Sequence, residues 1–200
     1  MAGSDRPQAA PTDAAVFDLE QRRLTAALAG DGQAFAALVR PHLAVMYRVA
    51  GRWARRDDLA EDAVQESLQL AWQQLERYRP GTSMRAWLLA IASRRAWTLS
   101  RAEMRRRGRE EASAAPEHPA DPEEHARAAH TAAVIDSVLQ TMPDKRRQAV
   151  ILRLDGGLAH AEIAAALDST EGSVRVLVHM ALKQLRTALT AAAAAEETGK

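Results

Sequence analysis

Small, polar and cationic side chains near the C-terminal end of the chain are spaced to contact a nucleic-acid duplex. Ser173, Arg175 and His179 fall where side chains of a predicted helix could reach base edges in a major groove, and Arg175 is the strongest candidate. Lys183 and Arg186 follow on the same helix and could neutralise phosphates. The backbone N–H groups at the start of that helix also suit phosphate contact. The pattern predicts a DNA-reading helix, and the alternative is a plain helical hairpin with a solvated polar face.

The segment that positions these side chains has the pattern of a helix-turn-helix. Residues 159–167 predict a short helix, residues 168–170 a tight polar turn with capping residues, and residues 173–190 a second helix. Small residues where the two helices cross allow them to approach closely, which presents the second helix outward. The inward stripe of this second helix is expected to consist of Val174, Leu177, Ala181, Leu182 and Leu185.

Catalytic and metal chemistry are poorly supported by the residue types present. The chain has no cysteine, which removes disulfides, thiolate metal sites and cysteine nucleophiles. His125 and His130 are five residues apart on different faces of a helix, and His160 with Glu162 gives half of a zinc-deaminase signature that lacks its cysteines. There is no glycine-rich phosphate loop and no Gly-x-Ser-x-Gly elbow. We therefore expect no metal, no cofactor and no enzymatic activity.

The composition indicates an all-α protein with two small domains. Aromatic residues make up 4% of the 200 residues, and the apolar content is mainly Ala, Leu and Val, which favours helices over strands. A proline-broken acidic stretch divides the chain and would let the two halves sit apart on an elongated partner. The formal net charge is +1, so nucleic-acid binding must come from locally concentrated arginine. The expected divisions are a disordered leader at 1–15, a helical domain at 16–107, a flexible acidic linker at 108–128, a helical domain at 129–190 and a frayed tail at 191–200.

Turn signals divide both predicted domains into helices. Breaks at Gly30–Gly32, Arg56–Asp58 and Pro80–Thr82 predict four helices before residue 107. In the second domain we expect helices at 129–141, 143–154, 159–167 and 173–190. No apolar run is long enough to cross a bilayer, and the N-terminal residues lack the pattern of a signal peptide. We therefore expect a cytoplasmic protein without membrane insertion.

At two places the sequence resembles the sigma-70 family of RNA polymerase sigma factors. The C-terminal half is similar to region 4 of that family in Pro143–Leu152 (PDKRRQAVIL), Gly157–Ala164 (GLAHAEIA) and Gly172–Arg175 (GSVR). The N-terminal half is similar to region 2 in Leu59–Glu66 (LAEDAVQE) and Arg85–Ala92 (RAWLLAIA). Two regions with only a short linker resemble the extracytoplasmic-function (ECF) group. The resemblance covers roughly residues 30–107 and 130–188, and it implies a protein that binds core RNA polymerase and directs it to promoters.

The resemblance implies polymerase contacts in region 2. Asp62, Gln65 and Glu66 match positions on the helix that packs against a coiled coil of the polymerase clamp, and an acidic, amide-bearing face suits a basic partner helix. Without the flanking motif, a solvated acidic face would be the simpler interpretation of these residues.

The resemblance also implies DNA contacts in both regions. The helix from Arg85 to Arg107 is similar to the element that opens the promoter, a task that requires cationic side chains along single-stranded DNA and a surface for unstacked bases. Arginines at a helix end could also simply complement the helix dipole. Region 4 would bind the upstream promoter element, and an anti-sigma factor would clamp the two domains. The residues implied for the downstream promoter element are Arg94, Arg95, Trp97, Arg101 and Arg105.

The sequence departs from the family pattern in ways that keep other hypotheses open. Arg94 replaces a usual asparagine, while Leu177 and Met180 occupy positions that are commonly basic. Upstream binding would then be weak or unusually selective. A helix-turn-helix regulator that acts without polymerase would explain residues 130–190 but give the N-terminal motifs no role, and a sigma-like protein used mainly as a binding partner is a further alternative.

Overall fold

The computed structural model describes residues 13–54, 56–79, 82–110 and 123–198, and the side chains of 18–54, 56–79, 82–106 and 130–195. The described residues contain helices and no strand, as the composition predicts. The predicted leader at 1–15 and the predicted linker at 108–128 fall largely outside the described residues. The helices are α1 (Asp13–Leu28), α2 (Gly32–Val39), η1 (Arg40–His42), α3 (Leu43–Ala54), α4 (Asp57–Gln73), η2 (Leu75–Arg77), α5 (Met84–Glu110), α6 (Glu123–Thr141), α7 (Asp144–Leu154), α8 (His160–Ala166) and α9 (Glu171–Thr198).

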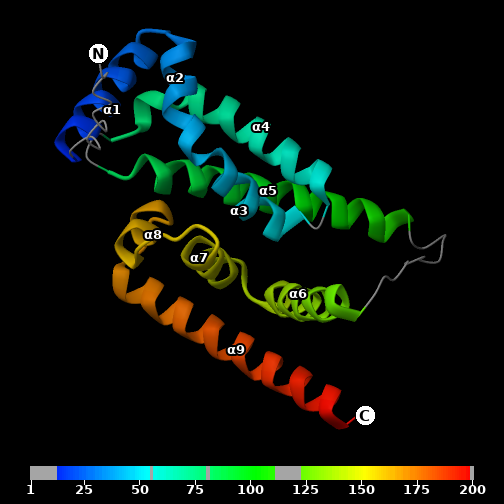
Figure 1. Ribbon diagram of the computed structural model, residues 1–200. Helices are drawn as coiled ribbons and strands as arrows, with labels where there is room; N and C mark the ends of the chain where they lie inside the picture. The colour runs from blue at the N-terminus through cyan, green and yellow to red at the C-terminus, as the bar shows by residue number, and fades with distance from the viewer. Residues whose placement is uncertain (1–12, 55, 80–81, 111–122, 199–200) are drawn as a thin grey trace, which may run out of the picture.

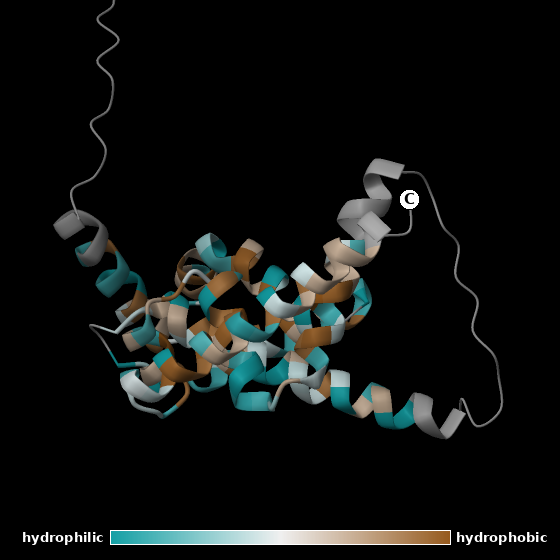
Figure 2. Cartoon of the chain, turned by 90° about the horizontal axis from the view of Figure 1, so that it is seen from below, coloured by the Kyte–Doolittle hydropathy of each residue, from teal (hydrophilic) through white to brown (hydrophobic). Residues whose placement is uncertain are grey.

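The N-terminal helices form a bundle in which α3, α4 and α5 pack side by side, with α1 and α2 at one end (Figure 1). Met46, Trp53 and Leu88 are almost fully buried at its centre. Ala63 and Val64 of α4 are also fully buried in this core, so the burial of one face of each helix fixes the orientation of the polar faces of α4 and α5. At the right of Figure 2 the C-terminal turns of α5 extend beyond the packed helices and are mostly hydrophilic.

The second predicted helix of this bundle is divided in the structure. Asp31 caps α2 by accepting hydrogen bonds from the backbone N–H groups of Gln33 (2.8 Å) and Ala34 (3.1 Å). Pro41 then follows in the short 3₁₀ helix η1, and α3 begins at Leu43. Proline lacks a backbone N–H and its ring clashes with the preceding helical turn, which explains why one continuous helix does not form.

The C-terminal helices contain the predicted helix-turn-helix. Between α7 and α8, the backbone N–H of Gly156 donates to the carbonyl of Ile151, and Gly157 has a φ of +65°. Between α8 and α9, Asp168 has a φ of +49°, and the hydroxyl of Thr170 accepts a hydrogen bond from the backbone N–H of Ser173 (3.2 Å). This cap begins α9 at the predicted place.

Three helices are longer than the sequence predicted, and one of them, α6, begins at Glu123 within the predicted linker instead of at residue 129. Helix α5 continues to Glu110, and α9 continues to Thr198, into the segment for which the sequence predicts fraying. The extension of α9 passes through Ala191–Ala195, and alanine has the highest helix propensity of all residues. A helix that is already formed can propagate through such a run at little cost.

The two helical halves pack against each other, whereas the sequence suggested that they could sit apart. Helices α7 and α8 contact α5, α7 also contacts α3, and one hydrophobic core runs through both halves. The guanidinium of Arg85 donates two hydrogen bonds to the carbonyl of Gly156, from Nε at 3.1 Å and from Nη2 at 2.7 Å. Arg52 in α3 lies 3.0 Å from a carboxylate oxygen of Asp155. Helix α9 lies on the far side of this interface (Figure 1).

Within the described part of the chain, no helix combines the length and apolar character that crossing a membrane requires.

Candidate nucleic-acid interface

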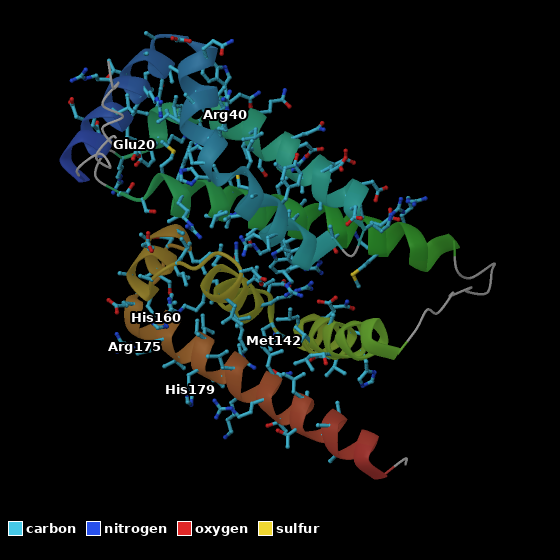
Figure 3. The ribbon with its side chains drawn as sticks, in the orientation of Figure 1. Glu20, Arg40, Met142, His160, Arg175 and His179 are labelled. Atoms are coloured by element: carbon cyan, nitrogen blue, oxygen red, sulfur yellow. The ribbon has the colours of Figure 1, made fainter. Side chains whose placement is uncertain are left out.

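The predicted DNA-reading side chains lie on the surface of α9. Arg175 and His179 point away from α7 and α8 (Figure 3), and all five predicted residues are exposed. They are held outward because the opposite stripe of α9 is buried: Val174 and Ala181 have 0% exposure and Val178 has 3%. Helix α9 therefore presents its first turns to solvent. The five exposed residues are Ser173, Arg175, His179, Lys183 and Arg186.

Arg175 has a partner within its own helix. Its Nη2 lies 2.7 Å from a carboxylate oxygen of Glu171, and both side chains are well exposed. A surface pair of this kind contributes little to stability, typically ~0.3–0.5 kcal/mol for residues four apart on a helix. A DNA ligand could therefore compete with Glu171 for the guanidinium at small cost.

Leu177 and Met180, which occupy positions that are commonly basic in the family, have different surroundings in the structure. Leu177 packs against the hydrophobic core, so it is not available to the face that would meet DNA. Met180 is 44% exposed, and Val176, which the sequence analysis did not single out, is 57% exposed. The helical spacing predicts that Val176 is exposed, because it lies on the opposite side of the helix from the buried stripe that begins at Val174.

The arginines of α5 are in contact with other side chains. Arg95 forms an ion pair with Glu66 of α4, and Arg101 lies 3.5 Å from a carboxylate oxygen of Asp144 at the start of α7. The guanidinium carbon of Arg101 is also 5.4 Å from the centre of the Trp97 ring. Two of the predicted downstream DNA residues are thus engaged by carboxylates in this arrangement.

Trp97 lies half-buried against the core, while Arg94 and Arg105 are exposed. The indole Nε1 of Trp97 is buried without a hydrogen-bond partner. The predicted downstream residues therefore do not form one open surface: two project freely into solvent, two pair with carboxylates, and the ring lies beneath Arg101.

The acidic face predicted on α4 is also present. Asp62 and Gln65 are exposed, and Glu66 is half-buried where it pairs with Arg95. Glu66 and Arg95 line a polar pocket of about 370 Å³ between α4 and α5, together with Gln69, Leu70 and Gln73. The structure thus brings a predicted polymerase contact next to a predicted DNA contact, which sequence reasoning did not anticipate.

A pocket with charged side chains of both signs, which the sequence analysis missed, lies between the two halves. Arg77 and Arg79 line a pocket of about 550 Å³ with Trp87, and its other side is lined by Glu162 of α8 and by Asp168 in the turn after α8. The signal was the pair of arginines just before the Pro80–Thr82 turn, but only the folded chain shows that α8 faces them.

No group of His, Asp or Glu side chains among the described residues is arranged to hold a metal ion.

Comparisons with known proteins place both halves of the chain in one family. Residues 38–108 match the description "Sigma-70 region 2", and residues 132–185 match "Sigma-70, region 4". The chain is 33% identical over 190 residues to the ECF RNA polymerase sigma factor SigE of Mycolicibacterium smegmatis, an alignment that covers 90% of this chain and 68% of SigE. The chain belongs to the ECF sigma factors.

The structure of this ECF sigma factor is similar to solved structures. CnrH in complex with the cytosolic domain of CnrY gives a TM-score of 0.66 at 23% identity, covering 87% of this chain and 99% of the matched chain. The sigma factor RpoE of Bartonella quintana, solved with the anti-sigma factor NepR, gives a TM-score of 0.56 at 24% identity, covering 78% and 96%. At these identities the two likenesses support the fold.

The two family matches correspond to the two helical halves of this sigma factor. Region 2 runs from the end of α2 through most of α5, so it includes the acidic face of α4 and the arginines of α5. Region 4 runs from α6 into α9 and includes the helix-turn-helix. The predicted site residues therefore all lie within the matched regions, apart from Arg186, which follows the second match by one residue.

Proposed function

We propose that this ECF sigma factor binds core RNA polymerase and directs it to promoters without catalysing a reaction itself. The observation that carries the proposal is the presence of both regions, 2 and 4, in one chain and in the family order. A helix-turn-helix alone would support only a DNA-binding regulator. Region 2 supplies a proposed surface for docking on the polymerase, which such a regulator does not need.

Region 2 would dock on the polymerase through the exposed face of α4. Asp62 and Gln65 offer a carboxylate and an amide to solvent, and Glu66 lies one step further along the same helix. Opposite charge across an interface raises the association rate and fixes the orientation of docking. We therefore assign a basic partner helix of the polymerase to this face.

Region 4 would hold the upstream promoter element on α9, and α5 would contact the downstream element. The exposed cations of α9 suit phosphates and base edges. On α5, Arg94 and Arg105 are free to meet single-stranded DNA, and Arg95, Arg101 and Trp97 would join them once their present contacts are exchanged. Affinity should rest largely on phosphate neutralisation and should fall as the salt concentration rises.

An inhibitory protein is the further partner that we propose. One relative in fold, RpoE of Bartonella quintana, was solved in complex with an anti-sigma factor. A protein of this class could hold regions 2 and 4 in the packed arrangement seen here, in which α8 lines one side of the pocket that contains Arg77 and Arg79.

Run-off transcription with purified core polymerase on a library of promoters tests the proposal. The wild-type factor should give promoter-specific transcripts that are absent without it. Asp62→Ala/Glu66→Ala should reduce co-elution with core polymerase, while Glu76→Ala, which removes an exposed acid in η2, should leave it unchanged. Arg175→Ala should lower the yield of transcripts, while Arg48→Ala, which truncates an exposed side chain of α3, should not.

Two results would contradict the proposal in different ways. If the acidic-face variant co-elutes normally with core polymerase, the docking assignment to α4 is wrong. If the wild-type chain binds duplex DNA specifically but never associates with core polymerase, the chain acts as a regulator of the helix-turn-helix class.

A further inference from the structure

Two apolar side chains occupy the exposed face of α9 where a DNA-reading helix would meet bases. Val176 is 57% exposed and Met180 is 44% exposed, and residues four apart on a helix are neighbours on its surface. The core of region 4 does not need them, because Val174, Val178 and Ala181 already form the buried stripe. Large apolar side chains gathered on an exposed helix face indicate a contact with a ligand.

The charges around the two side chains indicate what that ligand is. His179 and Lys183 lie on the same outer face, and Arg175 lies beside Val176. The one acid in the first turn, Glu171, pairs with Arg175. An apolar spot within a cationic face is therefore complementary to a polyanion that also carries apolar groups.

Contact with the neighbouring helix limits where Met180 can move. Nη2 of Arg146 in α7 lies 3.9 Å from the sulfur of Met180. This contact places the thioether near α7, and it brings a further guanidinium to the edge of the apolar spot. A base edge that met Met180 would thus have a cation beside it for the neighbouring phosphate.

The major groove of duplex DNA offers a polyanion with apolar groups, because thymine presents its C5-methyl group there. Guanine and cytosine edges offer only hydrogen-bonding groups, which Val176 could not satisfy. We propose that Val176 and Met180 read thymine methyl groups in the upstream promoter element, and thereby set its sequence preference. This inference rests on the proposed function, since it assumes that α9 enters the groove.

Replacing thymine by deoxyuridine in the DNA tests the inference without changing the protein. A promoter selected from the library with wild-type factor and core polymerase is resynthesised with deoxyuridine at each upstream thymine in turn. Base pairing is unaffected, and only the methyl group is lost. At one or two positions the apparent Kd of the holoenzyme should rise about fourfold, the factor that corresponds to burying one methyl group.

Matched variants assign the methyl groups to the two side chains. With Val176→Ser and Met180→Gln, the thymine promoter should bind more weakly, and substitution by deoxyuridine at the corresponding position should have no further effect. Leu182→Gln makes the same kind of change on a different flank of α9, because Leu182, which the sequence analysis placed inward, is 36% exposed and lines a groove with Leu139 and Leu185. This variant should keep the full sensitivity to deoxyuridine.

The outcomes separate this inference from the function on which it rests. Absence of any promoter-specific transcript with wild-type factor would overturn the proposed function. Transcription that depends on Arg175 but is unchanged by deoxyuridine at every upstream thymine would overturn the methyl-reading role alone. If Val176→Ser and Met180→Gln leave DNA binding unchanged but abolish binding of an inhibitory protein, the apolar face belongs to that protein, and the inference is wrong.

Discussion

At the scale of single residues, a buried hydrogen bond joins two helices of region 2. The indole Nε1 of Trp53 in α3 donates to the hydroxyl of Ser93 in α5 at 3.0 Å, and both side chains are almost completely buried. Ser93→Ala would leave the indole N–H without a partner and should lower the free energy of unfolding by about 1–3 kcal/mol. Chemical denaturation measures this change. Thr98→Ala removes an exposed hydroxyl from the same helix and should change the free energy of unfolding by less than about 0.5 kcal/mol. If the two variants lost equal stability, the buried hydrogen bond would not be the cause.

His42 gives a pH dependence whose sign follows from its surroundings. Burial lowers the pKa of this imidazole below its usual 6.5, and the positive charge of Arg85 lowers it further. As the pH falls through 6.5, the unfolded chain takes up a proton on His42 before the folded chain does. The free energy of unfolding should therefore fall between about pH 7 and pH 5. His42→Gln should flatten this slope in denaturation series, and an unchanged slope would show that other groups cause it.

The direction of individual side chains was partly predictable from the sequence. The helical period correctly placed Val174 inside and Arg175 outside, because consecutive residues on a helix differ by about 100°. It also placed Leu177 inward, while the comparison with basic family positions drew attention to it as a DNA contact. The structure shows Leu177 packed against the core and Val176 exposed. The partners of Arg95 and Arg101 could not be predicted, since Glu66 and Asp144 are brought to them only by the packing of helices far apart in the sequence.

At the scale of helices and turns, two glycines should respond oppositely to the same change. A Cβ at Gly156 would lie 2.4 Å from the carbonyl oxygen of Leu152, so Gly156→Ala requires the turn after α7 to move and should destabilise region 4. A Cβ at Gly51 in α3 would meet nothing within 4 Å. Gly51→Ala should therefore raise the free energy of unfolding by about 0.5–1 kcal/mol through helix propensity. Thermal unfolding of both variants checks the pair, and a shift in the same direction would contradict the packing argument.

Helix positions were predictable wherever a local signal ends or begins a helix. The Gly30–Gly32 turn and the Thr170 cap act within a few residues, so the sequence alone locates them. The split at Pro41 was missed because the apolar pattern continues on both sides of the proline, although the missing N–H predicts a break. The extension of α9 was missed because an alanine run has no apolar stripe that would suggest packing.

At the scale of the whole molecule, the packing of region 4 on region 2 affects the two proposed DNA surfaces differently. The outer face of α9 lies away from the interface, whereas Arg101 of α5 pairs with Asp144 of α7 across it. One side of the pocket that contains Arg77 and Arg79 is lined by α8. The proposed upstream surface is thus open in this arrangement, while in the proposed downstream surface only Arg101 would be released from its carboxylate partner if the two regions moved apart. The sequence could not predict this arrangement, because its acidic linker permits both packed and separated regions.

The contacts of Arg85 with the Gly156 carbonyl should hold the packed arrangement in place. These hydrogen bonds are half-buried, and Arg147 adds a guanidinium 4.2 Å from the centre of the Trp53 ring. Arg85→Gln/Arg147→Gln should therefore shift the molecule toward separated regions. The chain has no cysteine, so Glu61→Cys on α4 and Thr187→Cys on α9 allow two dyes to be attached at known places.

Energy transfer between these dyes should decrease in the Arg85→Gln/Arg147→Gln variant at low salt. Arg48→Gln, which changes an exposed arginine of α3 outside the interface, should leave it unchanged. Salt screens the ion pair of Arg52 and Asp155 but acts little on the hydrogen bonds from Arg85 to a carbonyl. In the protein with Arg85 and Arg147 intact, added salt should therefore open the molecule less than the double substitution does. If energy transfer in the double variant equals that of the parent protein at every salt concentration, the apolar core shared by α5, α7 and α8 holds the regions together, and the arginines contribute little.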